Sequence, residues 1–99
     1  MALSSDKIKQ YRTLAHSLNP IVTIAGKGLT ESVIAELDRA LEDHELVKVK
    51  VAVIDRQLRK ASIEEMCVST NATLIQEIGK VAVLFREAQK PDPKKSNIR

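Results

Sequence analysis

Two groups of residues in this chain have the types and spacing to bind an anion. The first is the pentad 26–30, Gly-Lys-Gly-Leu-Thr, which joins the β-branched run 21–24 to an amphipathic stretch that begins at Thr30. Glycines let backbone amides approach a ligand, and a helix start presents unpaired amides, so Lys27 between Gly26 and Gly28 favours a phosphate site. A plain strand-to-helix turn that needs positive φ explains the two glycines equally well.

The second group is the basic triplet Arg56, Arg59 and Lys60, which falls in the first turns of a helix expected after Asp55. Cations at a helix start oppose its macrodipole and cost about 0.3–1 kcal/mol each when exposed. Three such departures from a local rule near one place point to a function. The alternative is a solvated helix face on which these cations pair with neighbours such as Glu64.

A third pair of cations lies on the run 46–53, Leu-Val-Lys-Val-Lys-Val-Ala-Val, which has the period of a strand. The valines take one face of that strand, so Lys48 and Lys50 share the other. If the fold brings this face close to the glycine turn and the triplet, all of these cations form one basic surface.

Enzyme and cofactor motifs do not fit the chain. A phosphate-binding P-loop fails because Ile21 stands where its first glycine is required, and a dinucleotide fingerprint fails because Glu31 replaces its third glycine. The two histidines, His16 and His44, have no cysteine partners other than Cys67, so no Cys/His metal set exists. We therefore expect no catalytic residue, no metal and no cofactor.

The composition limits the kind of partner. Lys90, Lys94, Lys95 and Arg99 face only Asp92 in the last ten residues, an excess equal to the whole formal charge of +3. The remaining body is neutral, so only the positions of its charges can favour a polyanion. Tyr11 and Phe85 are the only aromatic residues of the types Phe, Trp and Tyr, too few for a base-stacking platform. Contacts to RNA should therefore reach mostly phosphate and sugar.

Periodicity and capping signals predict one α/β domain. We expect helices, strands and a closing hairpin at Gly79-Lys80 in the order α-β-α-β-α-β-β, over the following ranges: helix 4–18, strand 21–25, helix 30–44, strand 46–53, helix 55–70, strand 73–78 and strand 81–85. Helical crossovers favour parallel pairing of the early strands, and the hairpin must be antiparallel, so a mixed four-stranded sheet with packed helices follows. Residues 1–88 form this domain, and 89–99 are expected to be a flexible basic tail.

Four segments in the right order resemble one known family. They are 14–20 (Leu-Ala-His-Ser-Leu-Asn-Pro), 28–31 (Gly-Leu-Thr-Glu), 44–50 (His-Glu-Leu-Val-Lys-Val-Lys) and 78–86 (Ile-Gly-Lys-Val-Ala-Val-Leu-Phe-Arg). Together they are similar to the CRM domain, the chloroplast RNA splicing and ribosome maturation domain, in its stand-alone bacterial YhbY-like form. The resemblance implies a fold like the C-terminal domain of bacterial translation initiation factor three.

The resemblance also implies RNA binding through a GxxG loop and association with precursors of the large ribosomal subunit. The loop corresponds to Ala25-Gly26-Lys27-Gly28, in which Ala25 stands where the family has its first glycine. The family's basic surface carries over by position to Lys27, Lys48, Lys50, Arg56, Arg59 and Lys60.

These observations lead to a non-catalytic RNA-binding protein that acts in assembly of the large subunit, with ribosomal RNA as its partner. We expect it to be a cytoplasmic monomer without membrane contact or small-molecule substrate, because no apolar stretch could span a bilayer and the lone Cys67 fits a reducing compartment. The rival is a protein-interaction module that docks a partner through its acidic second helix or hairpin edge. A small-anion-binding enzyme is a third hypothesis.

Overall fold

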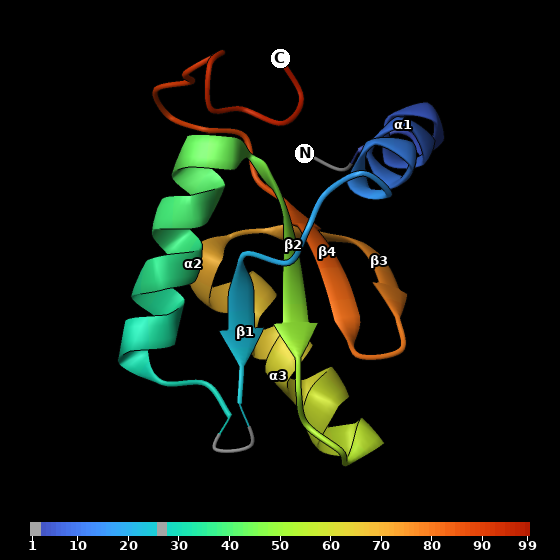
Figure 1. The fold of residues 1–99 in the computed structure, drawn as a ribbon, viewed down its shortest axis with the longest axis vertical. Coiled ribbons are helices and arrows are strands. Elements are labelled where there is room, and N and C mark those ends of the chain that lie inside the picture. The colour runs from blue at the N-terminus through green and yellow to red at the C-terminus, as the bar shows by residue number, and fades with distance from the viewer. Residues whose placement is uncertain (1–2, 26–27) are drawn as a thin grey trace.

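The structure, a computed structural model, describes residues 3–25 and 28–99 (Figure 1). Three helices and four strands alternate in the predicted order, and most boundaries lie within a few residues of those predicted. Their bounds are α1 Ser5–Ala15, β1 Val22–Ile24, α2 Glu31–His44, β2 Leu46–Val51, α3 Arg56–Thr70, β3 Thr73–Ile78 and β4 Val81–Phe85.

The four strands form one mixed sheet in the order β1-β2-β4-β3. β1 pairs with β2 in parallel, with Thr23 opposite Lys50, and β4 runs antiparallel to both β2 and β3. The predicted mixed sheet is thus confirmed. Because β4 and not β3 pairs with β2, the second strand of the closing hairpin lies in the centre of the sheet and β3 forms its edge.

Local side chains begin all three helices and end α3 where the sequence predicts, whereas α1 ends at Ala15, three residues before the predicted end. The side chains of Ser4, Thr30 and Asp55 accept hydrogen bonds from amides in the first turns of α1, α2 and α3. Asn71 ends α3 at φ 57°, in the left-handed conformation that asparagine tolerates. Gly79 adopts φ 55° at the hairpin, where glycine has no steric penalty.

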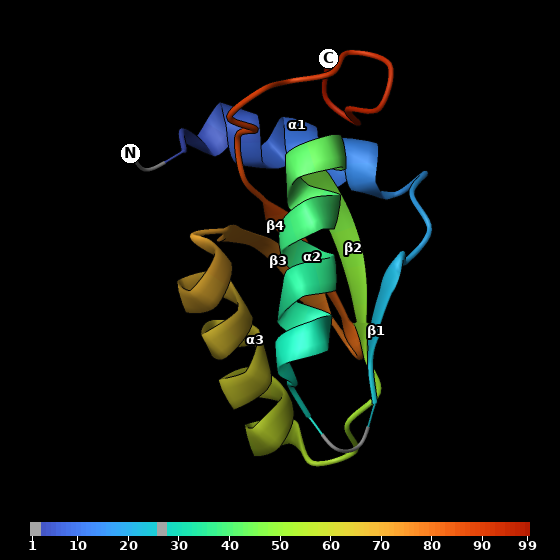
Figure 2. The ribbon, with the colours of Figure 1, turned by 90° about the vertical axis from the view of Figure 1, so that its left-hand side faces the viewer.

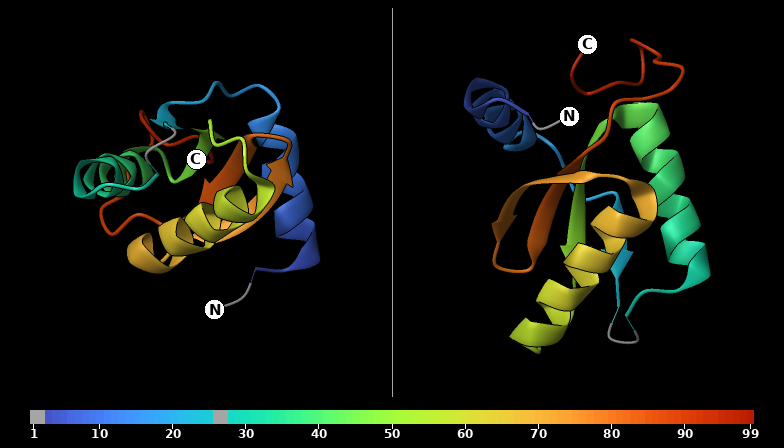
Figure 3. Two further views of the ribbon diagram at one scale, coloured as in Figure 1. Left: turned by 90° about the horizontal axis from the view of Figure 1, so that it is seen from below. Right: turned by 180° about the vertical axis from the view of Figure 1, so that it is seen from behind.

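Helices α2 and α3 cover one face of the sheet (Figures 2 and 3). The main core lies between them and the strands, and its fully buried members include Ile24, Leu37, Leu41, Val49 and Met66. Valines 47, 49 and 51 of β2 all point into this layer, which confirms the predicted apolar face of that strand. Burial of this layer is the main term that holds α2 and α3 on the sheet.

Helix α1 packs on the opposite face of the sheet but covers only one end of it. Tyr11 and Ala15 contact a second, smaller core with Leu46 and Phe85, and the Tyr11 and Phe85 rings stack at 4.6 Å between centroids. The rest of this face, toward the ends of β1 and β2, lies beyond α1 (Figure 1).

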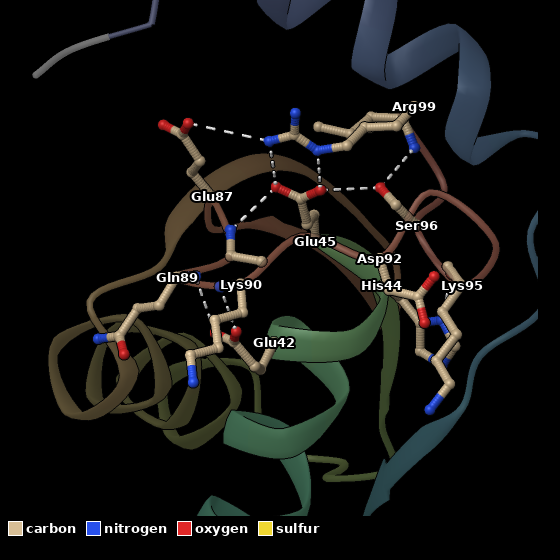
Figure 4. Close-up of polar contacts among 12 residues, drawn as sticks. Glu42, His44, Glu45, Glu87, Gln89, Lys90, Asp92, Lys95, Ser96 and Arg99 are labelled. Atoms are coloured by element: carbon tan, nitrogen blue, oxygen red, sulfur yellow. Dashed lines mark hydrogen bonds and ion pairs between the residues drawn. The ribbon is translucent and has the colours of Figure 1, made fainter.

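Segment 87–99 lies against the end of α2, fastened by the carboxylate of Glu45 (Figure 4). Glu45 accepts hydrogen bonds from the Ala88 amide at 2.9 Å and the Ser96 hydroxyl at 2.9 Å, and it pairs with the Arg99 guanidinium. In addition, the Asn97 amide group donates to the Leu46 carbonyl at 2.7 Å. The flexibility of residues 89–99 stays a prediction. A measurement of that flexibility should monitor the hydrogen bonds of Ser96, Asn97 and Arg99.

Candidate nucleic-acid interface

Three connections meet at one end of the sheet. β1 and β2 run in parallel and finish there, so the starts of α2 and α3 follow at the same end (Figures 1 and 2). The β3–β4 hairpin joins them, because the Val51 amide donates to the Lys80 carbonyl at 2.6 Å. We call this the loop end and define it as residues 25, 28–30, 50–60 and 79–80.

The glycine turn is described only in part, because Gly26 and Lys27 lie outside the described residues. At its two sides, the Gly28 amide donates to the Ala25 carbonyl at 2.9 Å, which closes a tight turn. Gly28 has φ +82°, and a Cβ added there would meet nothing within 4 Å. Glycine is therefore needed at 28 for its backbone conformation, and the space beside it is open.

The start of α2 follows directly from this turn. The Thr30 hydroxyl accepts from the Val33 amide at 3.3 Å, and other amides of the first turn have no intrahelical acceptor because of their position. The Gly28 amide already donates its hydrogen bond to the Ala25 carbonyl. The amides that can still donate to an anion are therefore those of the first turn of α2.

Two of the three cations at the start of α3 are exposed together. Arg56 and Lys60 are both exposed, and their separation of four residues puts them on one side of the helix. Beside them, the Asp55 carboxylate accepts from the amides of Gln57 at 2.8 Å and Leu58 at 3.2 Å. This capping charge offsets part of the unfavourable interaction between the cations and the helix dipole.

Arg59 differs from its two neighbours, because its guanidinium is used inside the protein. It donates to the carbonyls of Val53 at 2.8 Å and Ile54 at 3.2 Å, and it is only half-buried. Its Nε is buried and has no hydrogen-bond partner among the described residues. Arg59 therefore stabilises the conformation of the β2–α3 connection. Because part of its guanidinium is used there, Arg59 has fewer hydrogen-bond donors available to a phosphate than the exposed Arg56 has.

Lys48 and Lys50 share the face of β2 opposite its valines, as predicted, and α1 partly covers that face. Lys50 is exposed, with Thr23 and Val81 as its cross-strand neighbours. Lys48 is half-buried, and its ammonium donates to the Leu18 carbonyl at 3.1 Å. Lys50 thus belongs to the loop end. Lys48 lies two residues earlier on the same face of β2, closer to α1, and its hydrogen bond holds the segment that follows α1.

Lys80 is a cation at the loop end that sequence reasoning placed only in the hairpin turn. It is exposed, and its own carbonyl ties the hairpin to Val51. Lys80 lies near the other cations of the loop end only because β4 pairs with β2. The local sequence does not specify this strand order. The loop end therefore combines Lys50, Arg56, Lys60 and Lys80 as exposed cations.

The other side of the helical layer is acidic. A groove of about 540 Å³ between α2 and α3 is lined by the carboxylates of Glu31, Asp38 and Glu65 together with Leu29 and Ile34. Glu31 and Asp38 of this lining lie on α2, and their carboxylates repel a polyanion. Charges of opposite sign are therefore segregated between this groove and most of the loop end.

Other kinds of site find little support in the described ranges 3–25 and 28–99. No group of three His, Cys, Asp or Glu residues there could hold a metal ion. Within the same ranges, no helix is long and apolar enough to cross a membrane. Burial raises the pKa of the Cys67 thiol, with a smaller contribution from Glu64, so this cysteine has the character of a packed side chain and not of a reactive thiolate.

Comparisons with known proteins show which family the chain matches. Residues 3–86 match the sequence model of the CRS1/YhbY (CRM) domain. The Probable RNA-binding protein PA4753 of Pseudomonas aeruginosa is 46% identical over 99% of this chain and 94% of its own length. An RNA-binding protein of Haemophilus influenzae is 46% identical over 90% of this chain and 91% of its own.

The fold is also similar to a solved structure. The solution structure of the hypothetical protein SAV1595 from Staphylococcus aureus, described as a candidate RNA-binding protein, superposes with a TM-score of 0.78. It is 32% identical in sequence, and the alignment covers 90% of this chain and 93% of that one.

Proposed function

The chain belongs to the CRS1/YhbY (CRM) domain family, a non-catalytic family of RNA-binding domains, and we propose that it binds ribosomal RNA of large-subunit precursors through its loop end during ribosome assembly. The glycine turn 25–28 and the first turn of α2 receive the phosphodiester backbone. Arg56 and Lys60 extend the contact, Arg56 with the planar fork of donors that suits a phosphate.

The observation that carries this proposal is the convergence of three separate connections. Lys50 and Arg56 flank the β2–α3 connection and Lys80 lies in the β3–β4 hairpin, and the topology brings all three to the end of the sheet where the β1–α2 turn also lies. A neutral body gives no general attraction for RNA, so this local concentration supplies the electrostatic term.

The first test is a charge reversal at the loop end. Arg56→Glu should weaken binding to ribosomal RNA roughly 10-fold or more, because it removes one phosphate contact and adds a repulsive charge. Binding is measured by fluorescence anisotropy at constant salt.

Arg39→Glu is the matched control, because it makes the same change of charge at an exposed position on α2, away from the loop end. Equal losses from the two variants would show that only net charge matters and would contradict the proposed interface. Circular dichroism of both variants verifies that they remain folded.

The role in assembly needs a separate experiment in cells. The protein should migrate with free large subunits or their precursors when a cell extract is fractionated on a density gradient. A peak only at the top of the gradient would contradict the role in assembly. RNA binding would still be decided by the anisotropy measurement.

The rival function is a protein-interaction module, which is favoured by the acidic α2–α3 groove. Its apolar residues Leu29 and Ile34 lie beside the carboxylates of Glu31 and Glu65, a lining suited to a basic partner, whereas the Asp38 carboxylate is already paired with Arg86. In that case Glu65→Lys in the groove would abolish association with precursor particles, whereas Arg56→Glu would not. We propose the RNA interface as primary and expect a monomer in the bacterial cytoplasm.

A further inference from the structure

The part of the sheet face that α1 leaves uncovered carries a hollow that the proposed function does not use. Its apolar lining comes from Ile78, Val81 and Val83, and its polar lining comes from His16, Lys48 and Gln76. The hollow has a volume of about 190 Å³. Pockets for drug-sized ligands start at about 300 Å³, so this one suits a smaller group such as a single planar ring.

The apolar lining is unusually open for a sheet face. Ile78 is 59% exposed, and Val81 is only half-buried although it lies on the central strand β4. Isolated exposed apolar residues are common, but here exposed Ile78 and half-buried Val81 adjoin one hollow on the same face. A flat apolar group placed there would lose contact with water on one side and gain packing against aliphatic side chains.

The charge of this face is suited to a polyanion. Lys48 uses one donor on the Leu18 carbonyl, and an ammonium has three donors, so two are left. Lys50 lies directly across from Val81, at the border of the hollow nearest the loop end. The lining residues include no carboxylate. A phosphate on either side of a ring in the hollow would therefore find a cation within the same face.

The polar side chains provide a means of recognition. The Gln76 amide carries both hydrogen-bond donors and an acceptor, the combination that pairs with the edge of a nucleobase. The His16 imidazole adds two ring nitrogens that take part in hydrogen bonds. Tyr11 and Phe85 stack on each other beneath α1, so the ring would pack on aliphatic side chains and not on an aromatic platform.

We propose, on the premise that the chain binds RNA as stated above, that this hollow holds one unpaired nucleobase of the bound RNA. The base packs on Ile78 and Val81, its edge meets Gln76, and Lys48 and Lys50 contact the flanking phosphates. Bases inside a duplex are stacked and paired, so only a single-stranded segment can supply this group. The interface therefore distinguishes single-stranded RNA adjoining the loop end from a continuous duplex.

Gln76→Ala tests the hollow separately from the loop end. It should weaken binding of single-stranded RNA roughly 3- to 10-fold, the effect of losing one or two hydrogen bonds, and leave duplex binding unchanged. Gln10→Ala, at an exposed position on α1 outside the hollow, is the matched control and should leave both affinities unchanged. An equal affinity of Gln76→Ala and the unchanged protein for single strands would overturn the inference.

A measurement on the unchanged protein avoids any effect of substitution on folding. Methyl NMR signals of Ile78, Val81 and Val83 should shift on titration with a short single-stranded RNA and not with a duplex of the same length. If RNA binds but these methyl signals do not move, the hollow is not a base site and the loop-end proposal stands. If neither RNA binds, the proposed function itself fails.

Discussion

At the scale of single residues, Glu45 combines two features that are each unfavourable alone. It is a non-glycine residue with φ 63° and ψ −48°, and its side chain is completely buried. Backbone strain of this kind costs about 1–3 kcal/mol. The compensation is visible in Figure 4, where the carboxylate is surrounded by donors from Ala88, Ser96 and Arg99. The conformation directs this carboxylate to segment 87–99.

The same contacts make stability depend on pH. The Arg99 hydrogen bond, opposed by burial and assisted by the Ala88 amide, lowers the pKa of Glu45 from 4.5 to about 2. Since the folded pKa lies below the unfolded one, the stabilisation is complete above about pH 4.5 and is lost as pH falls toward 2. Acid should therefore release the 87–99 segment.

Glu45→Gln tests this contribution. It should lower the free energy of unfolding by roughly 1–3 kcal/mol near neutral pH, because buried donors lose their charged acceptor. The difference from the unchanged protein should shrink when urea unfolding is repeated near pH 3, because the carboxylate is largely protonated in the unfolded chain there and still ionised in the folded one. Glu36→Gln, at an exposed position on α2, should change stability little. A loss that stays constant from neutral to acid pH would contradict the assigned charge.

At the scale of elements, α3 carries a conflict at its start. Asp55 caps the helix, and its negative charge favours the positive end of the helix dipole. The same charge lies beside Arg56, at the surface where we propose that phosphate binds. Helix stability and RNA affinity therefore place opposite demands on position 55.

Asp55→Asn separates the two demands, because asparagine caps helices about as well as aspartate. The variant should bind RNA more tightly, roughly 2- to 5-fold at low salt, while stability changes by less than about 0.5 kcal/mol. Anisotropy and thermal unfolding measure the two quantities. Asp43→Asn, on α2 away from the loop end, provides the control for charge. Weaker RNA binding by Asp55→Asn would argue against a phosphate near the start of α3.

The elements that the sequence predicted are those whose signals are local. Ser4, Thr30 and Asp55 cap helices through amides within three residues, so a short window contains the whole interaction. Parallel pairing of β1 and β2 followed from the helical crossover between them. The position of Lys80 did not follow, because hairpin formation does not decide which strand the hairpin joins.

The roles that sequence reasoning missed depend on distant partners. Lys48 meets a carbonyl 30 residues away, and Glu45 meets Arg99 at a separation of 54 residues. Arg59 was assigned to the basic surface, but its guanidinium faces carbonyls of the loop that precedes its own helix. Residue type could not reveal these partners, because cations on exposed and on tethered positions look the same in a sequence.

At the scale of the whole molecule, basic residues lie at both ends of the sheet. The loop end gathers exposed cations, whereas segment 87–99 with Lys94 and Lys95 lies at the opposite end, beyond α1 and the end of α2 (Figures 1 and 3). The acidic α2–α3 groove lies along one side between them. A long RNA could contact both basic regions only by passing over the molecule, so we expect the loop end to dominate.

This arrangement predicts how binding depends on salt. If about four phosphates are neutralised at the loop end, the logarithm of affinity for duplex-like RNA should fall with the logarithm of salt at a slope near −3 to −4. Lys60→Ala should reduce the magnitude of that slope by about 0.9, because one counterion fewer is released. The combined substitution Lys94→Ala and Lys95→Ala removes twice the charge but should change the slope less, because segment 87–99 lies at the far end of the molecule. Anisotropy titrations at several salt concentrations measure all three slopes. A larger change from the tail substitutions than from Lys60→Ala would move the RNA contact to the end of the molecule where Arg99 meets Glu45.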